Sequence, residues 1–451
     1  MKKTFREKMM MVCVALLLLA FGSIVIRSTA RAILVRKLHQ DNALTRILFQ
    51  DNDNLLDVDF RKVDIDWAEK YPFRDVSVRE KEKKSDSPME KLKKAEYKVH
   101  RAENRLDEWT NKRFFNYIRL VELMNYYKKV IGWDIDIRGG YNSVIELEDG
   151  RFVEFADKVD MDWEISSLTD FSSYCREHKI NFILALAPGK IGPAESEYAG
   201  KLDFSNDNAD RLLQGLKENH VEYVDLRQVP EIKGKSHKDF FFITDHHWKP
   251  STARAAAAYT LNYLNQNHHY FADVSLLAPE RFEEKVYPKE FLGSYGKKVT
   301  LVRAEPDDFS LYYPKYPTLF SLKIPDIGLD QSGDFSIFYD MRQFERKRDY
   351  YGRVAYSSYT YGGHPLIRIR NRRKQDGRKV LLLHDSFGDT FTPFFSLGME
   401  NLDTIDPRRF DGSIKTFMEM EEPDTVIILF YISEIKANKS DVRYRKFFEI
   451  S

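Results

Sequence analysis

The chain contains very little cysteine for its length. Cys13 and Cys175 are the only two among 451 residues. Cys13 lies in an apolar N-terminal segment, so we do not expect an intramolecular disulfide between them. The low count does not indicate a reducing compartment, because an extracytoplasmic domain of this size can fold on its hydrophobic core without disulfides.

The chain also lacks an excess of charge of either sign. Its 71 Lys and Arg residues are balanced by 70 Asp and Glu residues, which leaves a net charge of +1 although 31% of the residues are charged. A nucleic-acid-binding protein usually shows a basic excess, so no nucleic-acid partner is predicted. The hydrophobic fraction of 43% suffices for a real core, and the length allows more than one domain.

An uncharged apolar run lies near the N-terminus. Residues 9–26, MMMVCVALLLLAFGSIVI, follow the basic segment MKKTFREK and are about long enough to span a bilayer. We predict that residues 1–32 form a cytoplasmic tail and an uncleaved signal anchor, with the rest of the chain outside the cell membrane in a single-pass topology. A cleaved signal peptide is the alternative, although Arg27 and Arg31 make a poor cleavage region.

Residues 33–130 are predicted to be a lead-in followed by a charged helical segment. The stretch 79–130 is dense in charge and contains no glycine, and Ser87-Pro88 is typical of a helix start. The simplest interpretation is a solvated helix or hairpin that holds the following domain away from the membrane. A partner-binding coiled coil is the alternative, but the apolar residues do not keep a sustained heptad.

Alternating strand and helix patterns begin near residue 131 and predict an α/β domain over residues 131–436. The predicted elements are a hairpin at 141–154, strands at 181–187, 222–226, 380–383 and 425–431, and helices at 165–178, 209–219, 251–265, 393–399 and 414–420. This alternation implies a parallel sheet with right-handed crossovers.

Residues 271–378 interrupt the alternation and are rich in Tyr, Pro and Asp. We predict a β-rich insertion packed over the site, with strands within 297–304 and 365–371. Paired glycines and a proline at 361–365 predict a turn. The last segment, 437–451, is basic and is predicted to be a solvated tail.

A serine follows one of the predicted buried strands. The stretch KVLLLHDSFGDTFTP places Ser386 just after an apolar run, where open α/β sheets hold their active sites. Gly388 would allow the backbone to turn sharply there. A plain loop with Ser386 as a helix N-cap explains the same stretch.

A second stretch, FFFITDHHWKP, supplies the partners that a serine nucleophile requires. The hydroxyl needs an imidazole to accept its proton and a carboxylate to orient that imidazole. In an extended segment residues i and i+2 point the same way, so we expect Asp245 and His247 to meet while His246 points away. Trp248 and Pro250 would hold the loop.

The oxyanion formed during acyl transfer needs hydrogen-bond donors. The candidates are the backbone N–H groups of Ser386 and Phe387 and a group from the turn at 361–363, including Gly363.

Other interpretations of these residues remain open. Asp245, His246 and His247 can form a metal site like that of Asp-His-His phosphoesterases, with Asp385 and Asp225 as further ligands. Asp245 can also cap the next helix, with both histidines on the surface. His384 is a weaker candidate for the base, because neighbouring strand residues face opposite sides.

Four motifs in this order carry a family resemblance: TDHHWKP, GGHP, HDSFGDTFTPFF and TIDPRRF. Over about residues 130–435 the chain resembles the DHHW family of bacterial extracytoplasmic proteins and the alginate O-acetyltransferase proteins of the SGNH superfamily. In these, the Asp-x-His-Trp motif precedes the serine motif. The resemblance implies a permuted SGNH-like, flavodoxin-like core with Asp245, His247 and Ser386 as the triad. The family's Gly-Gly-Asn turn appears here as Gly362-Gly363-His364.

The resemblance implies a membrane-anchored extracytoplasmic O-acetyltransferase. It would act on an exopolysaccharide or cell-wall polymer through an acyl-serine, beside a membrane-bound O-acyltransferase partner and with no cofactor or metal. Two alternatives remain: a carbohydrate esterase with the same triad, and a non-catalytic protein of polysaccharide assembly. The last predicts that Ser386→Ala leaves function intact and that residues 79–130 are essential.

Overall fold

The computed structural model of the 451-residue chain describes residues 122, 126, 144–345, 349–435 and 445–450. The predicted anchor at 1–32 and nearly all of the segment 33–130 lie outside the described residues. Among the residues that are described, no helix has both the length and the apolar character that crossing a bilayer requires.

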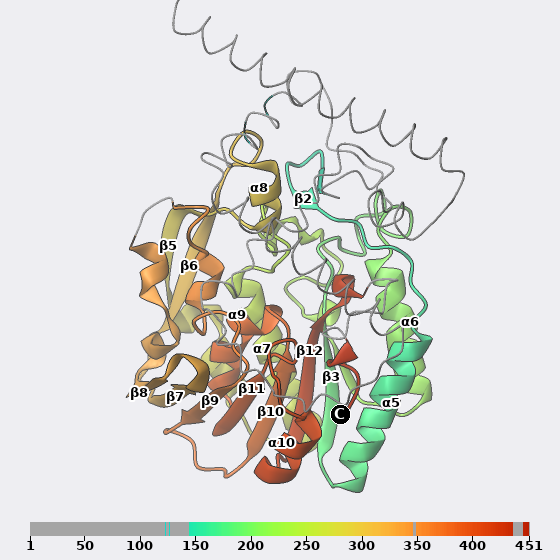
Figure 1. Ribbon diagram of the computed structural model, residues 1–451, viewed down its shortest axis with the longest axis vertical. Helices are drawn as coiled ribbons and strands as arrows, with labels where there is room; N and C mark the ends of the chain where they lie inside the picture. Colours follow the sequence, from blue (N-terminus) through green and yellow to red (C-terminus); the bar gives the residue numbers. More distant parts are fainter. Residues whose placement is uncertain (1–121, 123–125, 127–143, 346–348, 436–444, 451) are drawn as a thin grey trace, which may run out of the picture. The chain divides into compact units, whose positions relative to one another are not determined.

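An eight-stranded sheet organises the fold (Figure 1), in the order β4-β3-β12-β10-β11-β9-β7-β8. The first five strands in this order are parallel and the last three are antiparallel, so the sheet is mixed rather than purely parallel as predicted. The parallel strands are β3 (Asn181–Ala187), β4 (Tyr223–Asp225), β10 (Lys379–His384), β11 (Asn401–Ile405) and β12 (Thr425–Tyr431). The antiparallel strands are β7 (Phe320–Ile324), β8 (Leu329–Gly333) and β9 (Ile367–Asn371).

The parallel part has a permuted connectivity. When the parallel strands are counted from β10 to the end of the chain and then from β3 onward, their order across the sheet is 2-1-3-4-5, which is flavodoxin-like. The chain therefore enters this arrangement at its fourth strand. The strand that precedes Ser386 is the first of the series and lies at the point where the strand order reverses, which is where such sheets bind ligands.

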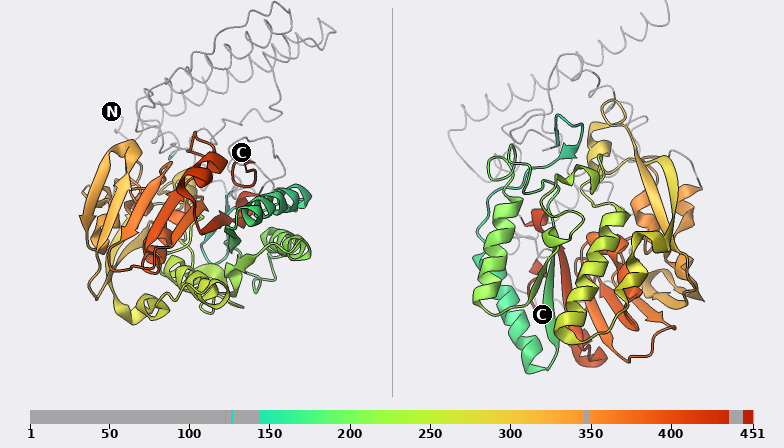
Figure 2. Two further views of the ribbon diagram at one scale, coloured as in Figure 1. Left: turned by 90° about the horizontal axis from the view of Figure 1, so that it is seen from below. Right: turned by 180° about the vertical axis from the view of Figure 1, so that it is seen from behind.

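Helices cover both faces of the sheet (Figure 2). α7 (Pro250–His268) and α9 (Phe387–Ser396) pack on one face, and α5 (Asp162–Glu177), α6 (Ser205–Glu218) and α10 (Ile414–Glu421) pack on the other. Alternate residues of each central strand enter the two cores: Ile427 and Leu429 of β12 face α7, while Val426 and Ile428 face α5. The unbroken apolar runs of these strands reflect burial on both faces.

Residues 271–378, predicted to be an insertion, contribute strands to the central sheet and also form a separate hairpin. β7, β8 and β9 extend the central sheet, while β5 (Phe282–Phe291) and β6 (Asp307–Pro314) form a separate antiparallel hairpin. The prediction of a strand within 297–304 was wrong, because α8 (Ser294–Val299) occupies its first part. Tyr295 and Val299, four residues apart on one helix face, are buried together with Phe152 of β2 (Phe152–Val153). β2 pairs with β1 (Ile145–Glu146) in the predicted hairpin.

Two further expectations need correction. The described part of the C-terminal tail is not fully solvated, because Phe447 and Phe448 are buried against Phe430. α9 begins at Phe387 rather than at Pro393. Proline inside a helix leaves the carbonyl four residues earlier without its amide donor, and here the Thr360 hydroxyl donates to that carbonyl, on Asp389, over 3.3 Å.

Candidate active site

Ser386 lies between the carboxyl end of β10 and the start of α9. It occupies the N-cap position of α9, but its side chain makes no capping hydrogen bond. Asp385 caps the helix instead, because its Oδ1 accepts from the N–H of Phe387, the first residue of α9, at 2.9 Å. Its Oδ2 accepts from the Tyr431 N–H of β12 at 2.8 Å. The interpretation of Ser386 as a simple helix cap is therefore wrong, and its hydroxyl is directed to another partner.

That partner is His247, in the loop between β4 and α7. The Ser386 Oγ lies 2.7 Å from His247 Nε2, although the two residues are 139 positions apart in the chain. On the other side of the ring, His247 Nδ1 is hydrogen-bonded to Asp245 Oδ1. Asp245 Oδ2 in turn accepts from the Ser294 N–H at 2.5 Å. The structure thus brings the three predicted side chains into one hydrogen-bonded chain.

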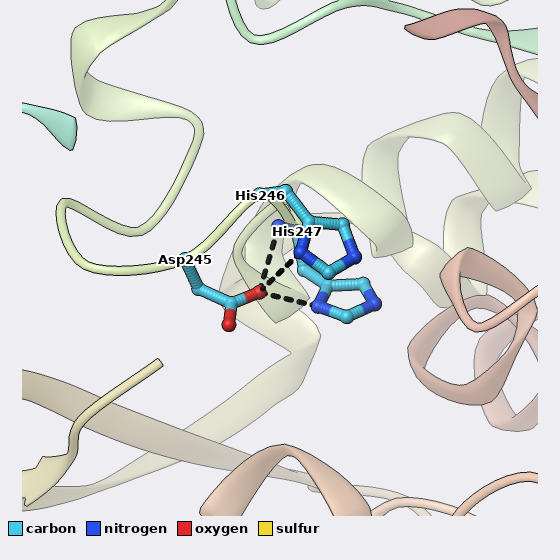
Figure 3. Close-up of side chains that lie close together, drawn as sticks. All are labelled: Asp245, His246 and His247. Atoms are coloured by element: carbon cyan, nitrogen blue, oxygen red, sulfur yellow. Dashed lines mark hydrogen bonds and ion pairs between the residues drawn. The ribbon is translucent and has the colours of Figure 1, made fainter. Parts of the chain in front are cut away.

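The backbone that presents Asp245 and His247 differs from the prediction. Residues 243–247 form bends rather than an extended strand, and Asp245 Oδ1 also accepts from the His247 N–H at 2.9 Å. This local turn, in which an Asp side chain binds a backbone amide two residues later, brings the pair together. His246 does not point away: its Nδ1 lies 3.5 Å from Asp245 Oδ1, and its ring lies 3.9 Å from that of His247 (Figure 3).

Aromatic rings enclose the His247 imidazole. Tyr356 stacks on it with ring centroids 4.0 Å apart, and Phe387 lies 5.2 Å away. Trp248 is fully buried, and its Nε1 donates to Thr390 Oγ1 at 2.9 Å. The Thr390 hydroxyl also bonds the Tyr356 hydroxyl at 2.9 Å. These contacts join the 243–247 loop to α9 and restrict the ring to the orientation that meets Ser386.

The electrostatics suit a carboxylate paired with an imidazole. Burial opposes the charge of Asp245, but the charges of His247 and His246 and the hydrogen bonds to the carboxylate outweigh it and hold the pKa of Asp245 well below its usual range. Burial, together with the neighbouring His247, lowers the pKa of His246 to about 4, so this ring is neutral at physiological pH. The site therefore holds one ionised carboxylate beside neutral His246.

The three oxyanion candidates differ in their surroundings. The Phe387 N–H is already bonded to Asp385, which contradicts its assignment as a free donor. The Ser386 N–H stands at the N-terminus of α9, where amides have no intrahelical acceptor. Gly363 packs against Arg409, since a Cβ there would lie 3.0 Å from the Arg409 Nε. His364, which follows it, has its Nδ1 2.8 Å from Asp326 Oδ2.

The competing interpretations of these residues fit the geometry less well. Asp245, His246 and His247 cluster closely enough to hold a metal ion. However, both oxygens of Asp385 are engaged by amides, and Asp225 is bonded to Arg227, so neither supplies the further carboxylate expected of a hydrolytic metal site. His384 Nδ1 lies 2.7 Å from the Asp385 carbonyl, and burial lowers its pKa. His384 is also packed against Gly388, where a Cβ would lie 2.1 Å from the ring, so Gly388 is required for space rather than for a left-handed turn.

Sequence reasoning missed several residues that support the site. Lys190 donates to the Asp245 carbonyl at 2.7 Å, and Asp307 accepts from the Thr244 N–H at 2.8 Å. The Tyr356 hydroxyl lies 3.2 Å from the Ser386 carbonyl oxygen. One signal was present: Lys190 follows the buried strand at 181–187, at the same sheet edge as Ser386. Nothing in the sequence pattern pointed to Asp307 or Tyr356.

Comparison with known proteins identifies what the domain that holds this site is similar to. Residues 158–308 match the family model described as "SGNH hydrolase-like domain, acetyltransferase AlgX". This region includes Asp245 and His247 and ends before Ser386. No curated protein sequence matches the chain.

The two solved structures of PatB1 show the same fold. Bacillus cereus PatB1 superposes with a TM-score of 0.56 at 18% identity, covering 68% of this chain and 99% of that chain. PatB1 with a sulfonyl adduct superposes with a TM-score of 0.53 at 18% identity, covering 68% of this chain and 97% of that chain. A DHHW family protein from Eubacterium siraeum has a TM-score of 0.49 at 18% identity, covering 68% of this chain and 95% of that chain. The predicted resemblance is confirmed: residues 158–308 of this chain are similar to the SGNH hydrolase-like domain of the acetyltransferase AlgX.

Proposed function

We propose that this protein is an O-acetyltransferase that moves an acetyl group through Ser386 to a hydroxyl of an exopolysaccharide or cell-wall polymer. The observation that carries the proposal is the hydrogen-bonded chain from Ser386 Oγ through His247 to Asp245. The match to an acetyltransferase family model supports transfer over other reactions of the same triad.

Each residue of the chain has a defined role in the first half-reaction. As the Ser386 Oγ attacks the acetyl carbonyl of the donor, its proton passes to His247 Nε2. Asp245 holds the proton on Nδ1, which leaves Nε2 as the acceptor, and stabilises the imidazolium that forms. His247 then protonates the departing donor oxygen, and the product is an acetyl ester on Ser386.

The second half-reaction reverses these roles with a sugar as acceptor. The sugar hydroxyl loses its proton to His247 Nε2 and attacks the acetyl carbonyl. The bond from the carbonyl carbon to Ser386 Oγ breaks, and His247 returns the proton to the serine. Water in place of the sugar gives an esterase, so access of the acceptor to the acyl-serine separates the two activities.

We extend the proposal to the protein's setting. The apolar run at 9–26 anchors the chain in the cell membrane with residues 131–436 on the outer side. A membrane-bound O-acyltransferase supplies the acetyl group there. These parts rest on the sequence and on the resemblance, and they are separable from the chemistry at Ser386.

The experiment that tests the chemistry uses fragment 33–451 and p-nitrophenyl acetate. Intact mass is followed for wild type, Ser386→Ala and His247→Ala. We expect an acetyl adduct in wild type that is absent from Ser386→Ala and forms slowly in His247→Ala. Candidate oligosaccharides are then added: loss of the adduct with acetylated sugar indicates a transferase, and loss with free acetate alone indicates an esterase. No adduct in a folded wild-type protein would refute the acyl-serine mechanism.

A further inference from the structure

The 243–247 loop owes its shape to groups that lie far from it in the sequence. It has no regular secondary structure, yet it must present Asp245 and His247 to Ser386. Its buried amides and carbonyls need partners, because an unpaired buried backbone group is costly. The Thr244 carbonyl accepts from the Gly296 N–H at 2.8 Å. Two charged side chains, Lys190 and Asp307, bind two further carbonyls and two amides of the loop.

Lys190 binds carbonyls from two chain segments. Its Nζ donates to Phe152 O at 2.5 Å, to Ile243 O at 3.0 Å and to Asp245 O at 2.7 Å. The residue is only 4% exposed. An ammonium group has three N–H donors, so the three carbonyls use all of them. One of these carbonyls belongs to Asp245 itself.

Asp307 binds the amides of the same loop. Its Oδ1 accepts from the Ile243 N–H at 2.9 Å, and its Oδ2 accepts from the Thr244 N–H at 2.8 Å and the Thr244 hydroxyl at 2.6 Å. A buried carboxylate that accepts three hydrogen bonds is well satisfied. Lys190 and Asp307 therefore hold opposite polar groups of one short loop, and each partly offsets the charge of the other.

We propose that Lys190 and Asp307 form a charged clamp that positions Asp245 and His247 for acyl transfer, and that activity requires the protonated ammonium of Lys190. They are positioning residues, because they act on the loop rather than on the reacting atoms. The proposal rests on the proposed function for its catalytic consequence, while the clamp itself can be tested without catalysis.

The surroundings of Lys190 bring its pKa close to physiological pH. Burial disfavours the ammonium and outweighs the nearby carboxylates of Asp307, Asp245 and Asp149, while Arg151 opposes the charge; together they lower the pKa of Lys190 to about 7. The ring of Tyr295 also faces the ammonium, 5.3 Å away. Loss of the proton leaves two N–H donors for three carbonyls. The neutral amine then releases one of the three carbonyls, which weakens the clamp and loosens the loop at alkaline pH.

The first experiment measures the clamp directly on the full-length protein labelled with 15N-lysine. We expect one Nζ resonance that titrates near pH 7 and that is missing from Lys190→Arg. Hydrogen exchange of the peptide spanning 240–248 is followed in wild type and Lys190→Met, with Lys217→Met, an exposed lysine of α6, as the matched control. Faster exchange in Lys190→Met alone is expected. Unchanged exchange there, or a Lys190 titration near the ordinary lysine value of about 10.4, would overturn the clamp.

The second experiment measures the rate of acyl-enzyme formation against pH. In wild type we expect a decline above about pH 7. In Asp307→Asn the decline should move to lower pH, because Asp307 is the largest influence that raises the Lys190 pKa. In Lys190→Arg the decline should be absent, because a guanidinium stays charged. Lys190→Met should lose about 10²-fold in rate, the scale expected for misplaced catalytic groups.

These outcomes separate the clamp from the acyl-serine mechanism. A wild type without an adduct refutes the proposed function, while the exchange and titration results still decide whether the clamp exists. A wild type with an adduct, together with Lys190→Met and Asp307→Asn variants that keep its rate and its pH profile, refutes the catalytic role of the clamp.

Discussion

Gly293, the residue just before α8, tests how closely the start of this helix packs on Asp245. Its φ of −72° and ψ of −179° suit any residue, so alanine is conformationally permitted there. Space is the difficulty: a Cβ would lie 2.2 Å from Asp245 Cβ and 2.6 Å from the Thr244 carbonyl oxygen. Contacts under 3.0 Å are essentially never found and ordinary contacts begin at 3.4 Å, so Gly293→Ala must push Asp245 Cβ away by at least 0.8 Å, and by 1.2 Å to reach ordinary contact. These atoms belong to the backbone or lie next to it, so the loop itself has to move.

The expected effect follows from that displacement. A misplacement of about 1 Å can cost about 10²-fold in rate, and overpacking a buried site costs about 1–3 kcal/mol. We expect both losses in Gly293→Ala, measured as the rate of acetyl adduct formation and as the free energy of unfolding in urea. Gly352→Ala is the control, because Gly352 is exposed and its Cβ would meet only the carboxyl end of the Asp349 side chain, away from the site. A Gly293→Ala protein that acylates at the wild-type rate would refute the packing argument.

Three further predictions test other parts of the site. Trp248→Phe removes the buried hydrogen bond to Thr390 and leaves space behind, so urea unfolding should show a loss of about 1–3 kcal/mol. Burial raises the pKa of Asp389, so the folded state keeps a proton that the unfolded chain releases above about pH 4, and stability falls as pH rises beyond that value. Asp389→Asn should therefore raise the Tm at pH 8 and leave it unchanged at pH 3; an equal change at both would contradict this. His246→Phe should still form the acetyl adduct, whereas His247→Ala should slow it by about 10²- to 10⁴-fold, and equal losses in intact-mass time courses would contradict their separate roles.

Local pattern predicted the elements that are buried on both faces. The apolar runs at 181–187 and 425–431 coincide with β3 and β12, because a strand between two helix layers has no polar face to interrupt it. β11 was not predicted, since Asp403 interrupts its apolar residues. That carboxylate is paired across the sheet with Arg370 of β9, at 2.7 Å. The pairing depends on strands that only the folded chain brings together.

For the site, too, some features follow from the sequence and others from the tertiary structure. The sequence by itself determined which residue types stand at strand ends, and so pointed to Ser386, His247 and Asp245 before any geometry was known. The tertiary structure alone decided that β12 lies between β10 and β3, that Asp385 rather than Ser386 caps α9, and that His246 turns toward the triad. Hydrophobic periodicity is a property of neighbouring residues, whereas strand order and buried ion pairs depend on contacts between segments whose spacing leaves no mark on the local pattern.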